Sequence, residues 1–216
     1  LHEGFKLILH MRMLFVSSHH RVQRSFRLQI FRIDCQVSMT KIETATSQLE
    51  LAVKILEELA KNGIESTMIG GMAMVTLGSQ RVTQDYDFLV DKKNREQKKL
   101  IEIFYQHGFE YVSKMEKGKI VRTVDNLNVA FARIQIDEPV TAFFYKHDIG
   151  LRMDVLFDFP YSAAEVHARA VKKKVEGTII YIASVEDLIR MKEIAYADRK
   201  KSSDLQDLEF LKSLKE

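Results

Sequence analysis

The spacing of apolar and polar positions divides the chain after about residue 40 into short segments of regular structure. Apolar residues three or four positions apart are typical of amphipathic helices. The predicted helices are Ile42–Asn62, Met72–Leu77, Arg95–His107, Ala163–Ala168, Ser184–Tyr196 and Ser203–Leu214. Apolar runs bounded by turn residues indicate strands. The predicted strands are Ser66–Ile69, Asp85–Val90, Glu110–Ser113, Ile120–Val124, Val129–Ile136, Val140–Tyr145, Leu151–Phe157, Val171–Val175 and Thr178–Ile182. Together they predict an α/β (α+β) fold.

Two short motifs interrupt this apolar pattern with residues that could take part in a reaction. Gly70-Gly71 follows a predicted strand and precedes a predicted helix, a place where a backbone can approach a phosphate closely. Asp85 and Asp87 lie two positions apart in a strand, so both carboxylates point to the same face. Hard divalent cations prefer such oxygen ligands. The segment therefore predicts a phosphate site beside a metal site.

Residues 1–38 differ from the rest of the chain. They contain five arginines, four of the seven histidines and the one cysteine, Cys35, with no clean periodicity. They carry four more basic than acidic residues, so residues 39–216 carry one more acidic than basic. Three interpretations stay open: an over-long start with Met39 as the initiator, an Arg-rich targeting segment, or an element that docks on the body.

Composition excludes several classes of protein. The chain of 216 residues has no apolar run of about 20 residues, so no membrane helix is predicted. One cysteine excludes an internal disulfide and a Cys-rich zinc site. Neither a Walker-type phosphate loop nor a Gly-x-Ser-x-Gly motif occurs. The body's charge gives no support to nucleic-acid binding, although Lys172-Lys173-Lys174, more simply a solvated face, could contact RNA.

The order of the motifs resembles the nucleotidyltransferase superfamily typified by DNA polymerase beta. That family has a Gly-Gly or Gly-Ser turn, about a dozen residues, and then an acidic–any–acidic triplet. Here thirteen residues separate Gly71 from Asp85. The family's third acidic residue, on a later strand, is matched by Asp154 between apolar neighbours; Asp148 and Asp158 are alternatives.

Within that superfamily the chain is similar to the bacterial AbiE-type toxins and their short stand-alone relatives. The matching segments are Gly70-Gly71-Met72-Ala73, Leu77-Gly78, Arg81-Val82-Thr83-Gln84-Asp85-Tyr86-Asp87, Leu188-Ile189-Arg190-Met191-Lys192, Arg199-Lys200-Lys201 and Asp204-Leu205-Gln206-Asp207-Leu208. Many of the toxins continue into a longer C-terminal helical region, whereas this sequence stops at Glu216.

The resemblance implies a nucleotidyltransferase fold, with a mixed, mostly antiparallel sheet flanked by helices. It divides the chain into an ill-fitting segment 1–38, a nucleotidyltransferase core 39–183, and helices 184–216 that close the nucleotide cleft. It implies transfer of a nucleoside monophosphate from an NTP such as ATP, with two Mg²⁺ or Mn²⁺ ions. The implied catalytic residues are Asp85, Asp87, Asp154 and Lys192, the first three as metal ligands. The implied nucleotide-binding residues are Gly70, Gly71, Arg81, Thr83, Lys192, Asp204 and Asp207, the last two of which could instead hold Lys192.

The acceptor stays open at this point. RNA or tRNA and protein are favoured, with an antitoxin as a further partner and a cytoplasmic location. Aminoglycosides are the acceptors in other branches of the superfamily. The hypothesis from a different class is a degenerate member that keeps the fold as a binding or antitoxin-like protein, against which the three acidic residues argue.

Overall fold

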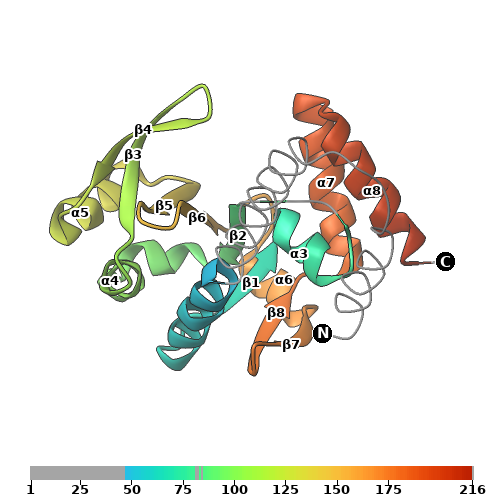
Figure 1. Cartoon of the computed structure of the whole chain (residues 1–216), viewed down its shortest axis with the longest axis horizontal. Coiled ribbons are helices and arrows are strands. Elements are labelled where there is room, and N and C mark those ends of the chain that lie inside the picture. The colour runs from blue at the N-terminus through green and yellow to red at the C-terminus, as the bar shows by residue number, and fades with distance from the viewer. Residues whose placement is uncertain (1–46, 81–82, 84, 216) are drawn as a thin grey trace, which may run out of the picture. The chain divides into compact units, whose positions relative to one another are not determined.

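One mixed sheet organises residues 47–80, 83 and 85–215, the part of the chain that the computed structural model describes (Figure 1). Within that part its eight strands run in the order β4-β3-β5-β6-β2-β1-β8-β7. Their bounds are β1 Ser66–Ile69, β2 Asp85–Val90, β3 Glu110–Glu116, β4 Lys119–Val124, β5 Thr141–Lys146, β6 Leu151–Phe157, β7 Val171–Val175 and β8 Thr178–Ile182. The pairs β2–β6 and β1–β8 are parallel and the other pairs antiparallel, as the predicted fold class requires.

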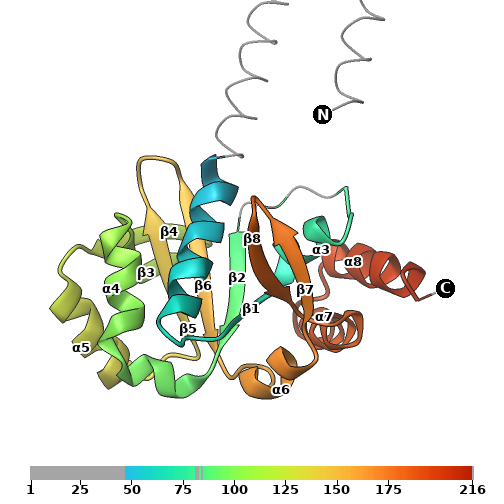
Figure 2. The ribbon, with the colours of Figure 1, turned by 90° about the horizontal axis from the view of Figure 1, so that it is seen from below.

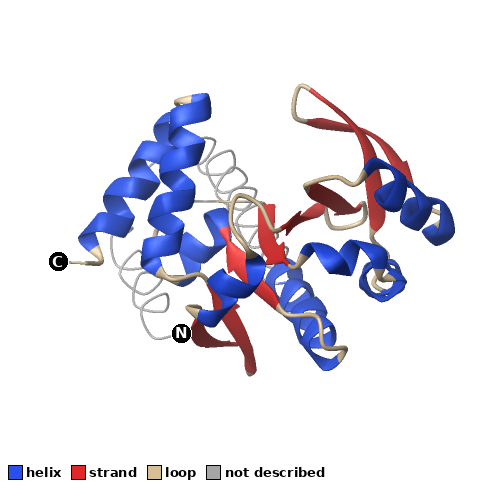
Figure 3. Cartoon of the chain, turned by 180° about the vertical axis from the view of Figure 1, so that it is seen from behind, coloured by secondary structure: helices blue, strands red, loops and turns tan. Residues whose placement is uncertain are grey.

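Helices flank this sheet and pack at its ends. Residues 47–61 form a helix that runs across the central strands (Figure 2). The labelled helices are α3 Gly70–Thr76, α4 Lys98–Gln106, α5 Leu127–Asp137, α6 Ala163–Ala168, α7 Val185–Arg199 and α8 Ser202–Ser213, with a 3₁₀ helix η1 at Lys92–Glu96. Helices α7 and α8 pack together at the end opposite α4 and α5 (Figure 3).

The core explains why the amphipathic segments form these elements. The helix of residues 47–61 contributes Ile55 and Leu59 to it, at most 1% exposed, four positions apart on one face. At the other end, the rings of Phe104 on α4 and Phe144 on β5 stack with their centroids 4.1 Å apart. The buried helix faces thus hold the sheet in place, and β2 lies between β1 and β6 at its centre.

One predicted strand is wrong. Val129–Ile136 was expected to be a strand, but these residues lie in α5. The Asn126 side chain accepts hydrogen bonds from the backbone N–H groups of Asn128 and Val129, which caps a helix start. Ala130 and Ile134, one helical turn apart, are buried while Ile136 is 80% exposed. The run of apolar residues that suggested a strand therefore includes side chains on the exposed face of a helix.

Other predicted elements form with shifted ends. The helix predicted from Met72 begins two residues earlier, at Gly70. The segment predicted as a helix over Arg95–His107 splits into η1 and α4. The helix predicted to end at Tyr196 continues to Arg199. The hairpin predicted across Glu176-Gly177 forms between β7 and β8.

Some sequence predictions fall beyond what can be compared. Residues 1–38 and Arg81 lie outside the described residues. The proposed boundaries at 38 and 183 stay predictions. Across the described residues, no helix is both long and apolar enough to span a bilayer.

Candidate active site

The Gly-Gly turn is built against the second acidic residue of the triplet. Gly70 has φ +65°, and a Cβ at this position would lie 1.9 Å from Asp87 Oδ2. The backbone N–H of Gly71 donates to the Asp87 carboxylate, which tends to lower the pKa of that carboxyl. A carboxylate at the start of α3 is favoured by the free N–H groups there. Only a residue without a side chain fits at Gly70. Asp87 already occupies part of the predicted phosphate site.

Strand register brings the third acidic residue beside this pair. In the parallel β2–β6 pair, Asp87 lies opposite Asp154 and Asp85 lies opposite Arg152. The pKa of Asp154 is raised to about 7, mainly by burial and next by the charge of Asp87. Burial, followed by the charge of Asp85, also raises the pKa of Asp87. The three carboxylates thus form a crowded, partly desolvated acidic cluster on one face of the sheet.

Arg152 is a site residue that the sequence analysis did not single out. One guanidinium nitrogen lies 2.7 Å from Asp85 Oδ2, while the group donates to both oxygens of Asp154 at 2.9 and 3.0 Å. The same side chain lies over the Phe143 ring, 5.8 Å from its centroid. Arg152 is two residues before Asp154 in a strand, so the period of two could have placed it on the acidic face. It supplies the positive charge between two of the acids.

The two rival acids have structural roles elsewhere. Asp158 accepts hydrogen bonds from the backbone N–H groups of Lys92 and Ala163 at 2.9 and 2.6 Å. Asp148 is mostly exposed and pairs with Lys146 at 3.0 Å. Of the three candidate acids, Asp154 is therefore the one that the fold places against the triplet.

Lys192, Asp204 and Asp207 come together in a buried network between α7 and α8. Lys192 Nζ lies 3.2 Å from Asp204 Oδ1 and 2.7 Å from Asp207 Oδ2. All three side chains are at most 11% exposed. The charge of Lys192 also tends to lower the pKa of Asp87, so the network lies near the acidic cluster. The expectation that the two acids hold Lys192 agrees with this geometry.

Arg199 completes that network. Its guanidinium donates to both oxygens of Asp204 at 2.7 and 2.9 Å. Burial works to raise the pKa of Asp204, but the hydrogen bonds from Arg199 and the charge of Lys192 outweigh it and lower that pKa. Asp204 is thus an ionised anchor for two cations. The basic stretch at Arg199 had been noted in the sequence without this role.

The remaining predicted nucleotide-binding residues precede β2. Thr83 is half-buried beside the acidic strand. Its neighbour Arg81 is outside the described residues, so its predicted contact with the triphosphate stays a prediction.

The donor set suits a hard divalent cation in its chemistry. Asp85, Asp87 and Asp154 offer only carboxylate oxygens, the ligands that Mg²⁺ prefers. Burial, and after it repulsion between these carboxylates, raises the pKa of Asp87 and of Asp154. No group of three or more His, Cys, Asp or Glu side chains in the described ranges is arranged to surround a metal as the side chains stand. Two of these acids contact the Arg152 guanidinium instead.

Comparison with known proteins places the fold. No protein-family model and no curated protein matches the chain. Among solved structures, it is similar to the solution structure of the antibiotic-resistance factor ANT(2″)-Ia, at TM-score 0.53 and 17% identity over 78% of this chain and 85% of that one. The crystal structure of ANT(2″)-Ia in complex with adenylyl-2″-tobramycin gives TM-score 0.52 and 16% identity over 78% and 90%. An antigenic nucleotidyltransferase-like protein from Paracoccidioides brasiliensis gives TM-score 0.52 and 16% identity over 77% and 76%.

The chain therefore has the nucleotidyltransferase fold that its motif order predicted. At these identities the likeness is one of fold. The closer resemblance to AbiE-type toxins is not addressed by these neighbours and stays a prediction.

Proposed function

We propose that the protein is a nucleotidyltransferase that moves a nucleoside monophosphate from an NTP to a hydroxyl acceptor. The observation that carries this proposal is the register that sets Asp87 opposite Asp154, with Asp87 fixed on the side-chain-free Gly70. A fold alone supports many functions, so the argument depends on this acidic cluster. A degenerate binding protein would have no need to keep three carboxylates in mutual repulsion.

In the proposed reaction the acceptor hydroxyl attacks the α-phosphorus of the NTP. A new P–O bond forms, the bond to the β-phosphate oxygen breaks, and pyrophosphate leaves with the electron pair. Asp154 is the proposed acceptor of the hydroxyl proton; without a bound metal ion its pKa is about 7, close to neutral pH. Lys192, in the α7–α8 network, contributes positive charge near Asp87, where it would favour a bound triphosphate.

Asp85, Asp87 and Asp154 are the residues that would hold divalent ions, Mg²⁺ or Mn²⁺. Such ions would supply charge stabilisation to the attacking and leaving oxygens. Arg152 would have to release Asp85 or Asp154 for these oxygens to become ligands. The Gly71 N–H, Arg81 and Thr83 are further candidates for contacts with the triphosphate. Asp204 and Asp207 would act indirectly, by holding Lys192.

Two more specific hypotheses about the role and the acceptor of this enzyme follow from different observations. The ordered motifs shared with AbiE-type proteins support a toxin paired with an antitoxin, in the cytoplasm. The fold likeness to ANT(2″)-Ia supports an aminoglycoside as an alternative acceptor. Expression in a bacterial host with and without a neighbouring antitoxin gene tests the first, and tobramycin as an acceptor tests the second.

The experiment for the transfer itself uses NTPs labelled at the α-phosphate. The protein is incubated with each NTP, Mg²⁺ and, in separate reactions, total RNA, total protein or tobramycin. We expect label in at least one acceptor pool and none with Asp85→Ala/Asp87→Ala. Failure of every NTP both to label an acceptor and to raise the Tm would refute the enzyme assignment, while label that survives the double substitution would refute the site.

A further inference from the structure

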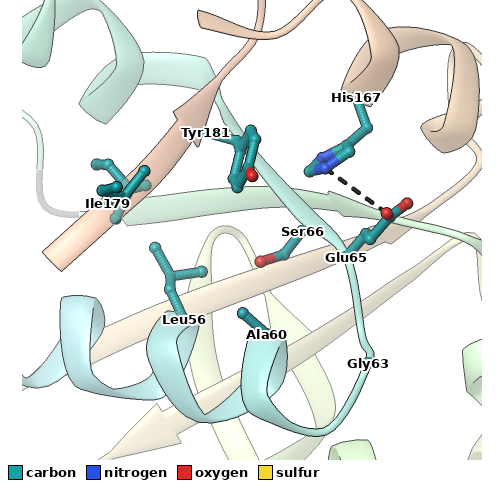
Figure 4. A pocket seen from close by; sticks show the side chains of 9 residues that line it. Leu56, Ala60, Gly63, Glu65, Ser66, His167, Ile179 and Tyr181 are labelled. Atoms are coloured by element: carbon teal, nitrogen blue, oxygen red, sulfur yellow. Dashed lines mark ion pairs between the residues drawn. The ribbon is translucent and has the colours of Figure 1, made fainter. Parts of the chain in front are cut away.

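A cavity of about 280 Å³ lies at the start of β1, at the other end of this strand from Gly70 (Figure 4). One wall is apolar and comes from Leu56 and Ala60 on the helix of residues 47–61. The opposite wall comes from Ile179 and Tyr181 on β8. Such a slot between an aliphatic wall and an aromatic ring suits a flat, largely apolar group.

The far end of the cavity is polar and fixed in place. His167 Nδ1 shares a hydrogen bond of 2.9 Å with the buried Thr67 hydroxyl, which holds the ring. His167 Nε2 lies 3.9 Å from Glu65 Oε1, beyond hydrogen-bond distance. Both groups therefore keep hydrogen-bonding capacity toward a bound molecule. The edge of a ligand that fits must offer an N–H to the carboxylate and a polar atom to the imidazole.

The mouth of the cavity is basic along one strand edge. In the β7–β8 hairpin, Lys172 lies opposite Tyr181 and Lys174 opposite Ile179, so both lysines share a face with the cavity wall. Lys172 Nζ lies 5.6 Å from the centre of the Tyr181 ring. Both lysines are exposed, and among the described residues neither has a carboxylate partner. Edge lysines also discourage strand pairing, which is the simpler reason for their presence.

Prevention of strand pairing would explain Lys172 and Lys174 but not the cavity beside them. We propose that the cavity and the Lys172/Lys174 face together bind single-stranded nucleic acid, with one base in the cavity and the adjoining phosphates on the two lysines. A nucleobase is flat and carries donors and acceptors along one edge; a carboxylate accepts from an exocyclic amine such as cytosine N4. Aromatic contact with lysine-bound backbone is the usual mode of single-strand binding. A polycationic aminoglycoside would be repelled by the same lysines.

The inference rests on the proposed function in one respect, since it makes nucleic acid the acceptor. By the strand registers, Tyr181, Thr67 and Asp87 lie on the same face of the sheet. Ser66 and Ile69, at the two ends of β1, are separated by about 10 Å along the strand. A base held in the cavity and the acidic cluster would thus lie at the two ends of β1.

The test is binding of fluorescein-labelled RNA of about 12 nucleotides to the full chain, followed by anisotropy without NTP or Mg²⁺. We expect Lys172→Ala/Lys174→Ala to weaken binding and to reduce the slope of log K against log salt by about 1.4, the value for two phosphates on a single strand. Tyr181→Ala should weaken binding about five- to hundred-fold while Tyr181→Phe keeps it, because the ring supplies the contact. Oligo(C) and oligo(A) should bind more tightly than oligo(U), and Glu65→Gln should reduce that preference.

The charge-matched control is Lys92→Ala/Lys98→Ala, which removes two exposed lysines on η1 and α4. Equal weakening by this control, equal affinity for a duplex of the same sequence, or absence of binding would overturn the inference. Because no NTP is present, the outcome is independent of catalysis. RNA binding without label transfer to any acceptor would support the inference and count against the proposed function. Label transfer to protein or tobramycin alone would support the proposed function and count against the inference.

Discussion

At the scale of single residues, Gly70 and Asp87 are matched to each other. Replacing Gly70 by Ala would place a methyl group 1.9 Å from the Asp87 carboxylate at φ +65°. We expect a loss of about 2–4 kcal/mol from overpacking and left-handed strain, measured by urea unfolding. Gly63→Ala is the control, since Gly63 has φ +72° and nothing within 4 Å of an added Cβ. It should lose only about 1–2 kcal/mol; equal losses for the two variants would contradict the predicted collision.

Arg152 is the second residue whose removal is informative. Arg152→Met would leave Asp154, whose side chain is 6% exposed, without its cation, and breaking a buried ion pair costs about 3–5 kcal/mol. The pair with the more exposed Asp85 adds little to this loss. We expect a lower Tm without divalent ions and a larger rise in Tm on adding Mg²⁺ than in the original protein. Arg122→Met, on the exposed edge strand β4, is the control. An Mg²⁺ response in Arg152→Met no larger than in the control would argue against a cation site at these carboxylates.

At the scale of elements, the start of α7 is held by a charged clamp that predicts a pH dependence. Asp187 is 1% exposed and accepts from Arg169 at 3.0 and 2.8 Å and from Ser184 at 2.8 Å. Burial works to raise the pKa of Asp187, but these hydrogen bonds outweigh it and lower that pKa. A lowered folded-state pKa stabilises the fold above the ordinary pKa of an Asp carboxyl, and that stability is lost as the pH falls through the lowered value.

Thermal unfolding of Asp187→Asn across pH therefore checks the clamp. The variant should have the lower Tm at pH 7. The difference from the original protein should shrink below about pH 4, where the Asp187 carboxyl of the unfolded chain becomes protonated while the folded one is still ionised. Asp198→Asn, an exposed acid on the same helix, should show no such narrowing. A difference in Tm that stays constant down to acid pH would show that the ionised form of Asp187 does not stabilise the fold.

The α7–α8 network makes a prediction about both stability and activity. Lys192→Met would remove the cation that Asp204 and Asp207 share in a buried setting, at a cost of about 3–5 kcal/mol in unfolding free energy. The additional substitution Asp207→Asn should recover part of the stability, but label transfer should stay low because the charge beside Asp87 is absent. Recovery of transfer in the double variant would assign Lys192 a purely structural role.

How far the elements could be predicted depends on which signal defined them. The strand Leu151–Phe157 formed as predicted because five of its seven residues are buried and apolar residues flank Asp154 on both sides. The strand predicted at Val129–Ile136 is wrong, because its apolar run includes the exposed side chains of Val129 and Ile136, and the signal that marks a helix there is the Asn126 cap. The start of α3 was placed two residues late because Asp87, distant in sequence, supplies the acid at its first turn.

At the scale of the whole molecule, the motif order predicted the fold and the convergence of Asp87 and Asp154, which the β2–β6 register produces. The order of motifs cannot show how charge is balanced once they converge. Arg152 was missed for that reason, since its role depends on two strands being neighbours. The cavity at Tyr181 was likewise invisible in the sequence, since its walls come from a helix and a strand more than a hundred residues apart.

The most direct measurement of the central claim compares two labels in one reaction mixture. The protein is incubated with Mg²⁺, RNA and ATP, CTP, GTP or UTP labelled at either the α- or the γ-phosphate, and the acceptor is isolated. We predict that RNA gains the α-label and not the γ-label, that pyrophosphate carries the γ-label, and that both are lost in Asp85→Ala/Asp87→Ala. Transfer of the γ-label to RNA, or release of labelled orthophosphate alone, would contradict nucleotidyl transfer.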